Sequence, residues 1–204
     1  MPQTPTDIIS RLSDRLSPAT LLADRRAAVL SLKGLSRDCK QEVGERALSG
    51  LLEVLYSDAE VDAEIGKAAL ETLTLLCDIE DVTANSRELG FKHTDTILVS
   101  EKAPHFLFAL LAESNFYSRY ATLQFLTILL HNRRQVVQAY FLTAPAGPRS
   151  IVAALEDKRE ILRNGRECFS LLLLSRFICF FCRGHRNGSG SRITKSRYPE
   201  SSGL

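Results

Sequence analysis

Thiols and an imidazole near the C-terminal end of the chain are the residues whose spacing could do chemistry. Cys179 and Cys182 are separated by two residues, and His185 follows at the same spacing. Such residues hold Zn²⁺ when a second pair completes a closed set of four ligands. Cys168 is the other candidate nearby, but apolar residues separate it from the rest. We therefore interpret them as incidental residues and predict no metal site.

Known catalytic motifs are absent from the sequence. It contains no G-x-S-x-G nucleophile elbow, no phosphate-binding P-loop, no H-E-x-x-H and no dinucleotide fingerprint. His93, His105 and His131 have no cysteine or carboxylate partner at catalytic spacing, so we interpret them as core or surface residues. The sequence predicts that the protein is not an enzyme, with no catalytic residues and no cofactor.

Composition and charge are those of an ordinary globular chain. The 204 residues are 45% hydrophobic and 25% charged, enough for a continuous core. Residues 1–175 carry 20 basic and 23 acidic side chains, whereas residues 176–204 carry six and one. The body therefore lacks the basic face that nucleic-acid binding needs. Five cysteines without a signal sequence indicate free thiols in the cytosol, and no apolar run reaches the roughly 18 residues of a membrane span.

The elements that must position these side chains are helices, and the clearest pair spans residues 20–56. Ala28, Val29 and Leu32 recur at helical spacing in the first helix of the pair. The second helix repeats the pattern at Val43, Ala47, Leu51, Val54 and Leu55. Neither helix can bury its apolar stripe alone, so the pair needs neighbours of the same kind. The pattern therefore predicts a helical solenoid, in which similar helix pairs stack on one another.

The rest of the chain is predicted to continue the pattern. Apolar spacing predicts further helices over residues 7–16, 62–78, 116–131, 134–142 and 149–155, and one from about Pro104. Ser17 and Pro18 fit the cap and first turn of the helix that follows them. Residues 79–95 are acidic and polar, so we predict a long surface loop there. Residues 1–6 contain two prolines and are predicted to be disordered.

An internal repeat can be tested by counting. The triplet Val29-x2-Leu32-x2-Leu35 recurs as Leu70-x2-Leu73-x2-Leu76 and as Leu123-x2-Leu126-x2-Leu129. The offsets are 41 and 53 residues. The first offset fits the armadillo and HEAT period of about 40–47 residues. We interpret the second as that period plus the acidic loop.

Residues 20–36 carry a resemblance to a known family. They read TLL-x-DRR-x-AV-x2-LK-x-LS and are followed by EVG at residues 42–44. Shorter matches are EIG-x-A at 64–68, F-x2-R at 116–119, QV at 135–136 and REILRN at 159–164. The pattern resembles the N-terminal head of the general vesicular transport factor family, over residues 8–164.

This resemblance implies both a fold and a function. In that family the head is an armadillo-like superhelix, which precedes a long coiled coil and an acidic C-terminus. The proteins are dimeric tethers that hold transport vesicles near Golgi membranes. They are effectors of a Rab-type GTPase and contact golgins and SNAREs. A cytoplasmic protein, peripheral on Golgi and vesicle membranes, is thus implied.

Residues 165–204 depart from the family pattern. Aligning Arg119 with Arg163 predicts apolar residues at three later positions, but two of these are Glu167 and Ser170. No heptads follow. We interpret this stretch as a divergent, partly disordered basic tail after a partial head at residues 7–164, and hypothesise a retained intron or a frameshift. Dimerisation and SNARE contact through a coiled coil are left open.

Three stretches are candidates for partner contact. Asp24-Arg25-Arg26 could bind a partner, but we favour a helix start capped by Asp24, with the arginines solvated or ion-paired. The acidic stretch 78–88 could meet a basic partner, and we favour a solvated loop. The apolar stretch 169–181 could touch a membrane surface, and we favour an uncapped solenoid end. The sequence leaves the partner-binding residues unassigned.

The sequence therefore predicts an all-α, armadillo/HEAT-like right-handed superhelical solenoid of stacked helix pairs. Its predicted function is vesicle tethering in ER-to-Golgi and intra-Golgi transport, by protein recognition. Two alternatives stay open. One is a generic armadillo adaptor, although the chain has none of the tryptophans that such grooves carry. The other is a regulatory helical subunit of an enzyme.

Overall fold

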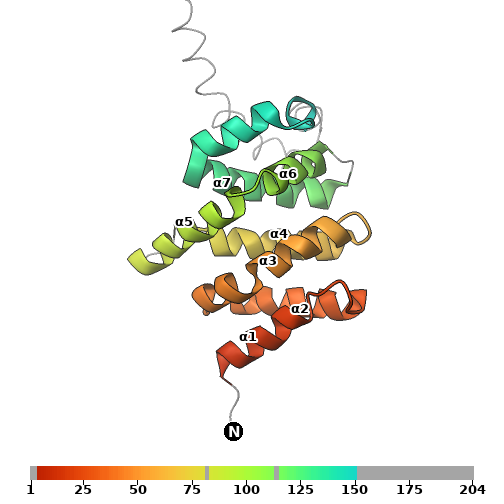
Figure 1. Cartoon of the computed structure of the whole chain (residues 1–204), viewed down its shortest axis with the longest axis vertical. Coiled ribbons are helices and arrows are strands. Elements are labelled where there is room, and N and C mark those ends of the chain that lie inside the picture. Colours follow the sequence, from red (N-terminus) through yellow and green to blue (C-terminus); the bar gives the residue numbers. More distant parts are fainter. Residues whose placement is uncertain (1–3, 81–82, 113–114, 151–204) are drawn as a thin grey trace, which may run out of the picture. The chain divides into compact units, whose positions relative to one another are not determined.

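Seven helices form the part of the chain that the structure, a computed structural model, describes: residues 4–80, 83–112 and 115–150 (Figure 1). All of these residues lie in the first of the chain's two compact units, Met1–Leu173. No strand occurs within the described ranges. The prediction of an all-α, armadillo-like fold is confirmed.

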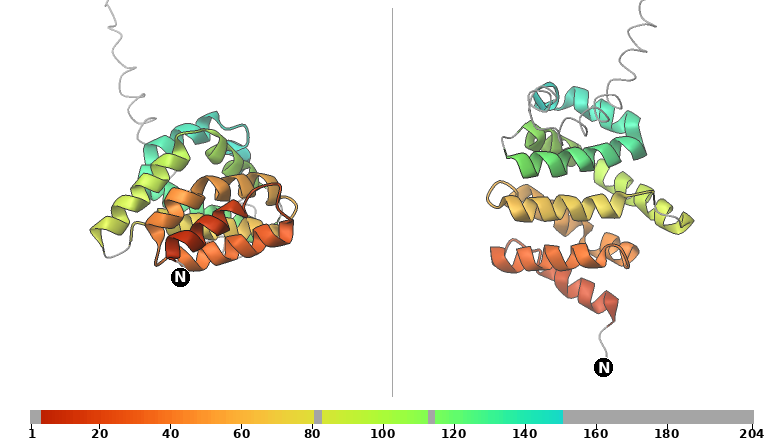
Figure 2. Two further views of the ribbon diagram at one scale, coloured as in Figure 1. Left: turned by 60° about the horizontal axis from the view of Figure 1, so that its bottom comes forward. Right: turned by 180° about the vertical axis from the view of Figure 1, so that it is seen from behind.

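The helices pack in two rows. The first row consists of α2 (Leu22–Leu35), α4 (Ala63–Cys77) and residues 116–132 of α7 (Phe116–Thr143), and each packs against the next. Figure 2, seen from behind, shows these three helices stacked one above another. The second row consists of α1 (Pro5–Asp14), α3 (Lys40–Asp58), α5 (Ala84–Leu98) with α6 (Lys102–Ala112), and residues 134–143 of α7.

The leucine triplets form the core of the first row. Leu32, Leu73 and Leu126 are the central residues of the three triplets, and all are fully buried. The equivalent helices α2 and α4 pack directly on each other, as do α4 and α7. Stacking therefore buries the apolar stripe that each helix cannot cover alone, with about 25 cal/mol gained per Å² of apolar surface removed from water.

One predicted loop is wrong: most of residues 79–95 belong to α5. The Thr83 hydroxyl accepts a hydrogen bond from the Ser86 amide and caps this helix. The buried side of α5 carries few apolar residues, namely Ile97 and Leu98 beside Ser86, Gly90, His93 and Thr94. An apolar spacing test cannot detect such a helix. The extra length of the second repeat therefore holds two helices, α5 and α6, in place of a loop.

Gly90 permits the close approach of α5 to the end of α4. A Cβ atom at this position would lie 2.7 Å from the Asp78 carbonyl oxygen and 2.8 Å from Ile79 Cγ2. Real Cβ atoms do not approach so closely, so only glycine fits. Figure 1 shows α5 slanting across the stack.

Two predicted helix starts are also wrong. Helix α2 begins at Leu22 after Leu21, with no capping side chain, so neither Ser17 nor Asp24 is the cap. Helix α1 begins at Pro5, inside the stretch predicted to be disordered. Thr4 explains this start, because its side chain accepts from the Asp7 amide while the Asp7 carboxylate bonds back to Thr4.

A bend divides α7 where the sequence predicts two helices. Arg133 has non-helical backbone angles, φ −139° and ψ 58°, and the chain is helical on both sides. Its guanidinium bonds to both carboxylate oxygens of Asp95 on α5, at 2.5 and 2.7 Å. The bend turns the chain from the first row into the second without a loop.

None of the helices in the described ranges is long and apolar enough to span a membrane. The predicted helix at 149–155 lies almost wholly outside the described residues, as do the stretches 159–164 and 165–204.

Candidate functional site

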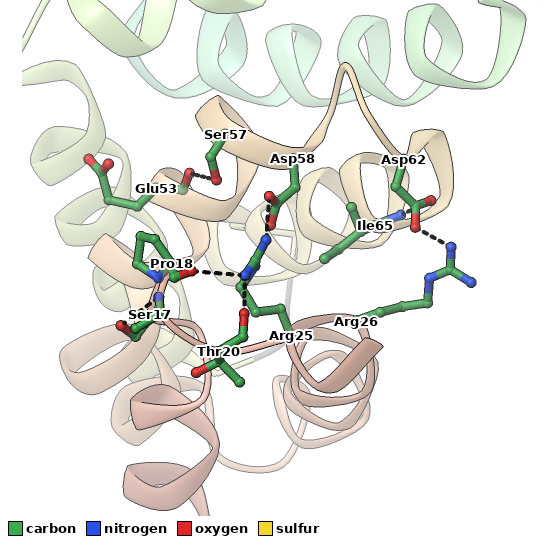
Figure 3. A network of polar contacts seen from close by, with 11 residues as sticks. Ser17, Pro18, Thr20, Arg25, Arg26, Glu53, Ser57, Asp58, Asp62 and Ile65 are labelled. Atoms are coloured by element: carbon green, nitrogen blue, oxygen red, sulfur yellow. Dashed lines mark hydrogen bonds and ion pairs between the residues drawn. The ribbon is translucent and has the colours of Figure 1, made fainter. Parts of the chain in front are cut away.

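The arginines of the Asp24-Arg25-Arg26 motif join α2 to two neighbouring helices, Arg25 to the end of α3 and Arg26 to the start of α4 (Figure 3). Arg25 reaches Asp58, at the end of α3, through two hydrogen bonds of 2.7 Å. Its guanidinium also donates to the Pro18 carbonyl at 3.3 Å and to the Thr20 carbonyl. The hydrogen bond to Asp58 raises the pKa of Arg25 further above its ordinary value.

Arg26 makes an equivalent but more exposed contact. It pairs with Asp62, which also caps α4 by accepting from the amides of Glu64 and Ile65. Burial acts to raise the pKa of Asp62, but the hydrogen bonds from Arg26 and from the two amides outweigh it, so this pKa lies below its ordinary value. The hydrogen bond to Asp62 raises the pKa of Arg26. Both arginines therefore form ion pairs within the chain, as the ion-paired interpretation expects, and Asp24 is exposed.

The histidines have three different environments. His93 is buried between α3, α4 and α5, and its Nδ1 lies 2.9 Å from the Leu76 carbonyl oxygen. His105 is half-buried on α6, and His131 is exposed on α7. The three are not brought together. Within residues 4–80, 83–112 and 115–150, no group of three or more His, Cys, Asp or Glu side chains could hold a metal ion.

Arg119 is buried in the first turn of α7. The other candidate site residues, Cys168, Cys179, Cys182, His185 and Arg163, lie outside the described residues, as does the apolar stretch 169–181. The zinc and membrane-contact interpretations of that region stay predictions.

Two pairs of rings join helices of the second row, and we call their four residues the aromatic strip: Tyr56 on α3, His105 and Phe106 on α6, and Tyr140 on α7. The rings of Tyr56 and Phe106 meet edge to face, with centroids 5.2 Å apart. The rings of His105 and Tyr140 do the same at 6.2 Å. All four side chains are half-buried, so each keeps part of its surface exposed to solvent.

Polar contacts fix the strip in place. The Tyr140 hydroxyl donates to the Leu98 carbonyl at 2.8 Å. The Lys102 ammonium lies 4.0 Å from the centre of the Tyr56 ring and 3.4 Å from Glu53. Burial, with a smaller contribution from Glu53, raises the pKa of Tyr56 to about 12, so its hydroxyl stays protonated at physiological pH.

Exposed apolar residues extend the strip. Val99, next to the carbonyl that Tyr140 binds, is 83% exposed. Val136 lies one turn before Tyr140 on α7 and is also exposed. The nearby charges Lys102 and Glu53 neutralise each other, as do Arg133 and Asp95. A rigid aromatic surface with paired charges suits contact with another protein, because aromatic residues are enriched where proteins bind.

No sequence motif pointed to this strip. Its members are separated by up to 84 residues, between Tyr56 and Tyr140, and come from three helices. The one usable signal is that each sits on the exposed side of a predicted helix. Only the stacking of the helices determines which of these side chains lie on the same face of the protein.

Helices stacked in two rows define the chain as an armadillo-like helical repeat protein. No family model matches it. It is 35% identical to the human (Homo sapiens) general vesicular transport factor over 168 residues, which are 79% of this chain and 17% of that protein. It is 36% identical to Golgin candidate 6 of Arabidopsis thaliana over 173 residues, 82% of this chain and 18% of that protein.

A solved structure agrees with these relatives. The crystal structure of Uso1-1 matches with a TM-score of 0.73 and 25% identity, over 82% of this chain and 29% of that one. The chain belongs to the general vesicular transport factor family, as the block at residues 20–36 indicates. It spans less than a fifth of the length of the curated relatives compared above.

Proposed function

We propose that this chain acts in vesicle tethering between the ER and the Golgi and within the Golgi, by recognising other proteins without doing chemistry. The observation that carries the proposal is the aromatic strip on a scaffold whose relatives are transport factors. The partner we propose is a Rab-type GTPase in its GTP form, and golgins and SNARE proteins are further partners. The proposed location is the cytoplasmic side of Golgi and vesicle membranes.

Rigidity supports this role for the strip. Each ring is held by a ring contact, a hydrogen bond or a nearby cation, so little side-chain freedom is lost when a partner binds. Tyrosine adds a hydroxyl to a large apolar body, which lets one residue make both kinds of contact. Such residues carry most of the binding energy at many protein interfaces.

Binding of Rab-type GTPases loaded with GDP or with a non-hydrolysable GTP analogue tests the proposal. We expect isothermal titration calorimetry with the full chain to show tighter binding of the GTP form. Replacing Tyr56 with alanine is expected to weaken binding by about 30-fold, the effect of losing about 2 kcal/mol at a binding hot spot.

Tyr117→Ala is the matched control, because Tyr117 is 60% exposed but lies on the first row, away from the strip. We expect its affinity to equal that of the unaltered chain. Equal binding of both nucleotide forms, or no binding, contradicts the GTPase as partner. Unchanged affinity of a folded Tyr56→Ala variant contradicts the strip as the contact surface.

A further inference from the structure

Helix α5 buries more polar than apolar side chains. Its buried residues are Ser86, Gly90, His93, Thr94, Ile97 and Leu98. Helix α4, of the same length, buries a nearly continuous apolar side. Apolar burial is the main stabilising contribution to packing, and single hydrogen bonds contribute only about 1 kcal/mol each. The described helices thus differ in how firmly they are attached, and α5 has the smaller apolar contribution.

Besides the more exposed ion pair of Arg133 with Asp95, three buried side chains make polar contacts that fasten α5. We call them the latch: Lys40 on α3, His93 on α5 and Asn132 on α7. The Lys40 ammonium donates to the Asp78 carbonyl at 2.5 Å and to the Ser86 hydroxyl at 3.2 Å. The Asn132 amide donates to the Cys77 carbonyl and to the Thr94 hydroxyl, both at 2.8 Å. Each therefore ties α5 to α4.

His93 is the member of the latch that can change charge near neutral pH. Its Nδ1 faces the Leu76 carbonyl, so Nδ1 carries the proton and Nε2 is an acceptor. Nε2 is buried against Gly44 with no hydrogen-bond partner among the described residues. A second proton on Nε2 would create a buried charged donor without an acceptor, which is costly.

The groups around His93 favour its neutral form. Burial is the main cause that lowers the pKa of His93 below 6.5, and the positive charges of Lys40 on α3 and Lys92 on α5 add to it. The Leu76 carbonyl and the exposed Glu45 on α3 act in the opposite direction. From α4, the Cys77 thiol stays neutral, because burial raises its pKa to about 12.

We infer that α5 opens as a unit when His93 takes up a second proton, while α2, α4 and α7 stay folded. The sign follows from linkage: the unfolded chain binds the proton more tightly than the folded one, so stability is complete above the unfolded pKa of 6.5 and decreases as the pH falls below it. Opening of α5 uncovers Cys77, which is fully buried when α5 is closed.

Cys77 makes this opening measurable in the unaltered full chain. A thiol reagent that remains active in acid is added at a series of pH values, and peptide mass spectrometry reads the labelling of Cys77. Each rate is divided by the rate for the unfolded chain at the same pH. We expect this ratio to rise by up to about tenfold between about pH 7.5 and about pH 5.5, the limit set by proton uptake of the open state as the pH falls one unit below 6.5. Amide hydrogen exchange is expected to accelerate in α5 and not in α4.

Matched variants separate the causes. His93→Gln is expected to remove the pH dependence, since glutamine can still donate to Leu76 but cannot be protonated. His131→Gln, at the exposed histidine, is expected to keep the rise. Thr94→Val removes a partner of Asn132 and is expected to raise Cys77 labelling equally at every pH.

Several results would overturn the inference. These are labelling of Cys77 that does not change with pH, the same rise in His93→Gln, or simultaneous loss of amide protection in α4. Should His93→Gln not fold, nitrogen NMR of the histidines in the unaltered chain decides the question. A pKa of His93 at or above 6.5 removes the linkage.

Discussion

Replacing Arg25 with alanine is expected to lower the free energy of unfolding by about 3 kcal/mol, the typical cost of removing one partner of a buried ion pair. The side chains of Arg25 and Asp58 are only 11% and 6% exposed. Without the guanidinium, the Asp58 carboxylate is left buried, and the Pro18 and Thr20 carbonyls lose a donor. Urea unfolding followed by far-UV circular dichroism measures the loss.

The neighbouring arginine provides the control. Arg26 also leaves α2 to pair with a carboxylate, that of Asp62 at the start of α4, but its side chain is 41% exposed. Water screens such a pair, so Arg26→Ala is expected to cost about 0.5 kcal/mol. Equal losses for the two variants would mean that burial of Arg25 and Asp58 does not set the strength of this contact. A smaller loss for Arg25→Ala than for Arg26→Ala contradicts the prediction outright.

Gly44→Ala is the second change with a large expected effect, a loss of about 2–3 kcal/mol from overpacking. A Cβ atom at residue 44 would lie 2.0 Å from His93 Nε2 and 2.3 Å from Cε1. The imidazole ring cannot simply rotate away, because Nδ1 is bound to the Leu76 carbonyl and the ring is buried. Thermal or urea unfolding of the purified chain measures the effect.

Gly34→Ala is the matched control, since Gly34 is also a glycine within a helix. A Cβ atom there meets nothing within 4 Å, so alanine is expected to stabilise the chain by up to about 1 kcal/mol through helix propensity. The two substitutions should therefore have opposite signs. Combining Gly44→Ala with His93→Ala is expected to cost less than the two single losses added together. Strict additivity would show that the two side chains do not collide.

The first row was predictable from the sequence, and α5 was not. Leu32, Leu73 and Leu126 lie on the buried side of their helices, and this side recurs at helical spacing. The spacing of apolar residues therefore predicts which residues are buried. Helix α5 follows no such spacing, because its buried positions hold Ser86, His93 and Thr94, whose partners come from other helices. A polar stretch between apolar helices therefore resembles a loop until its partners are known.

The contacts between helices, those of the candidate site included, could not be predicted from the sequence for a related reason. Arg25 and Asp58 are 33 residues apart, and Gly44 and His93 are 49 apart. Their contacts depend on how neighbouring layers are aligned, to within a fraction of a helical turn. The block at residues 20–36 indicated the family correctly. Nothing in it distinguishes an arginine that is ion-paired inside the fold from one that is exposed and binds another protein.

The bend at Arg133 has a mechanical consequence. Within α7, a single non-helical residue connects the part in the first row to the part in the second, so no loop separates them. A pull on the helix before the bend reaches the helix after it through covalent bonds, while Asp95 clamps the bend itself. The two parts of α7 are thus joined without a flexible linker between them.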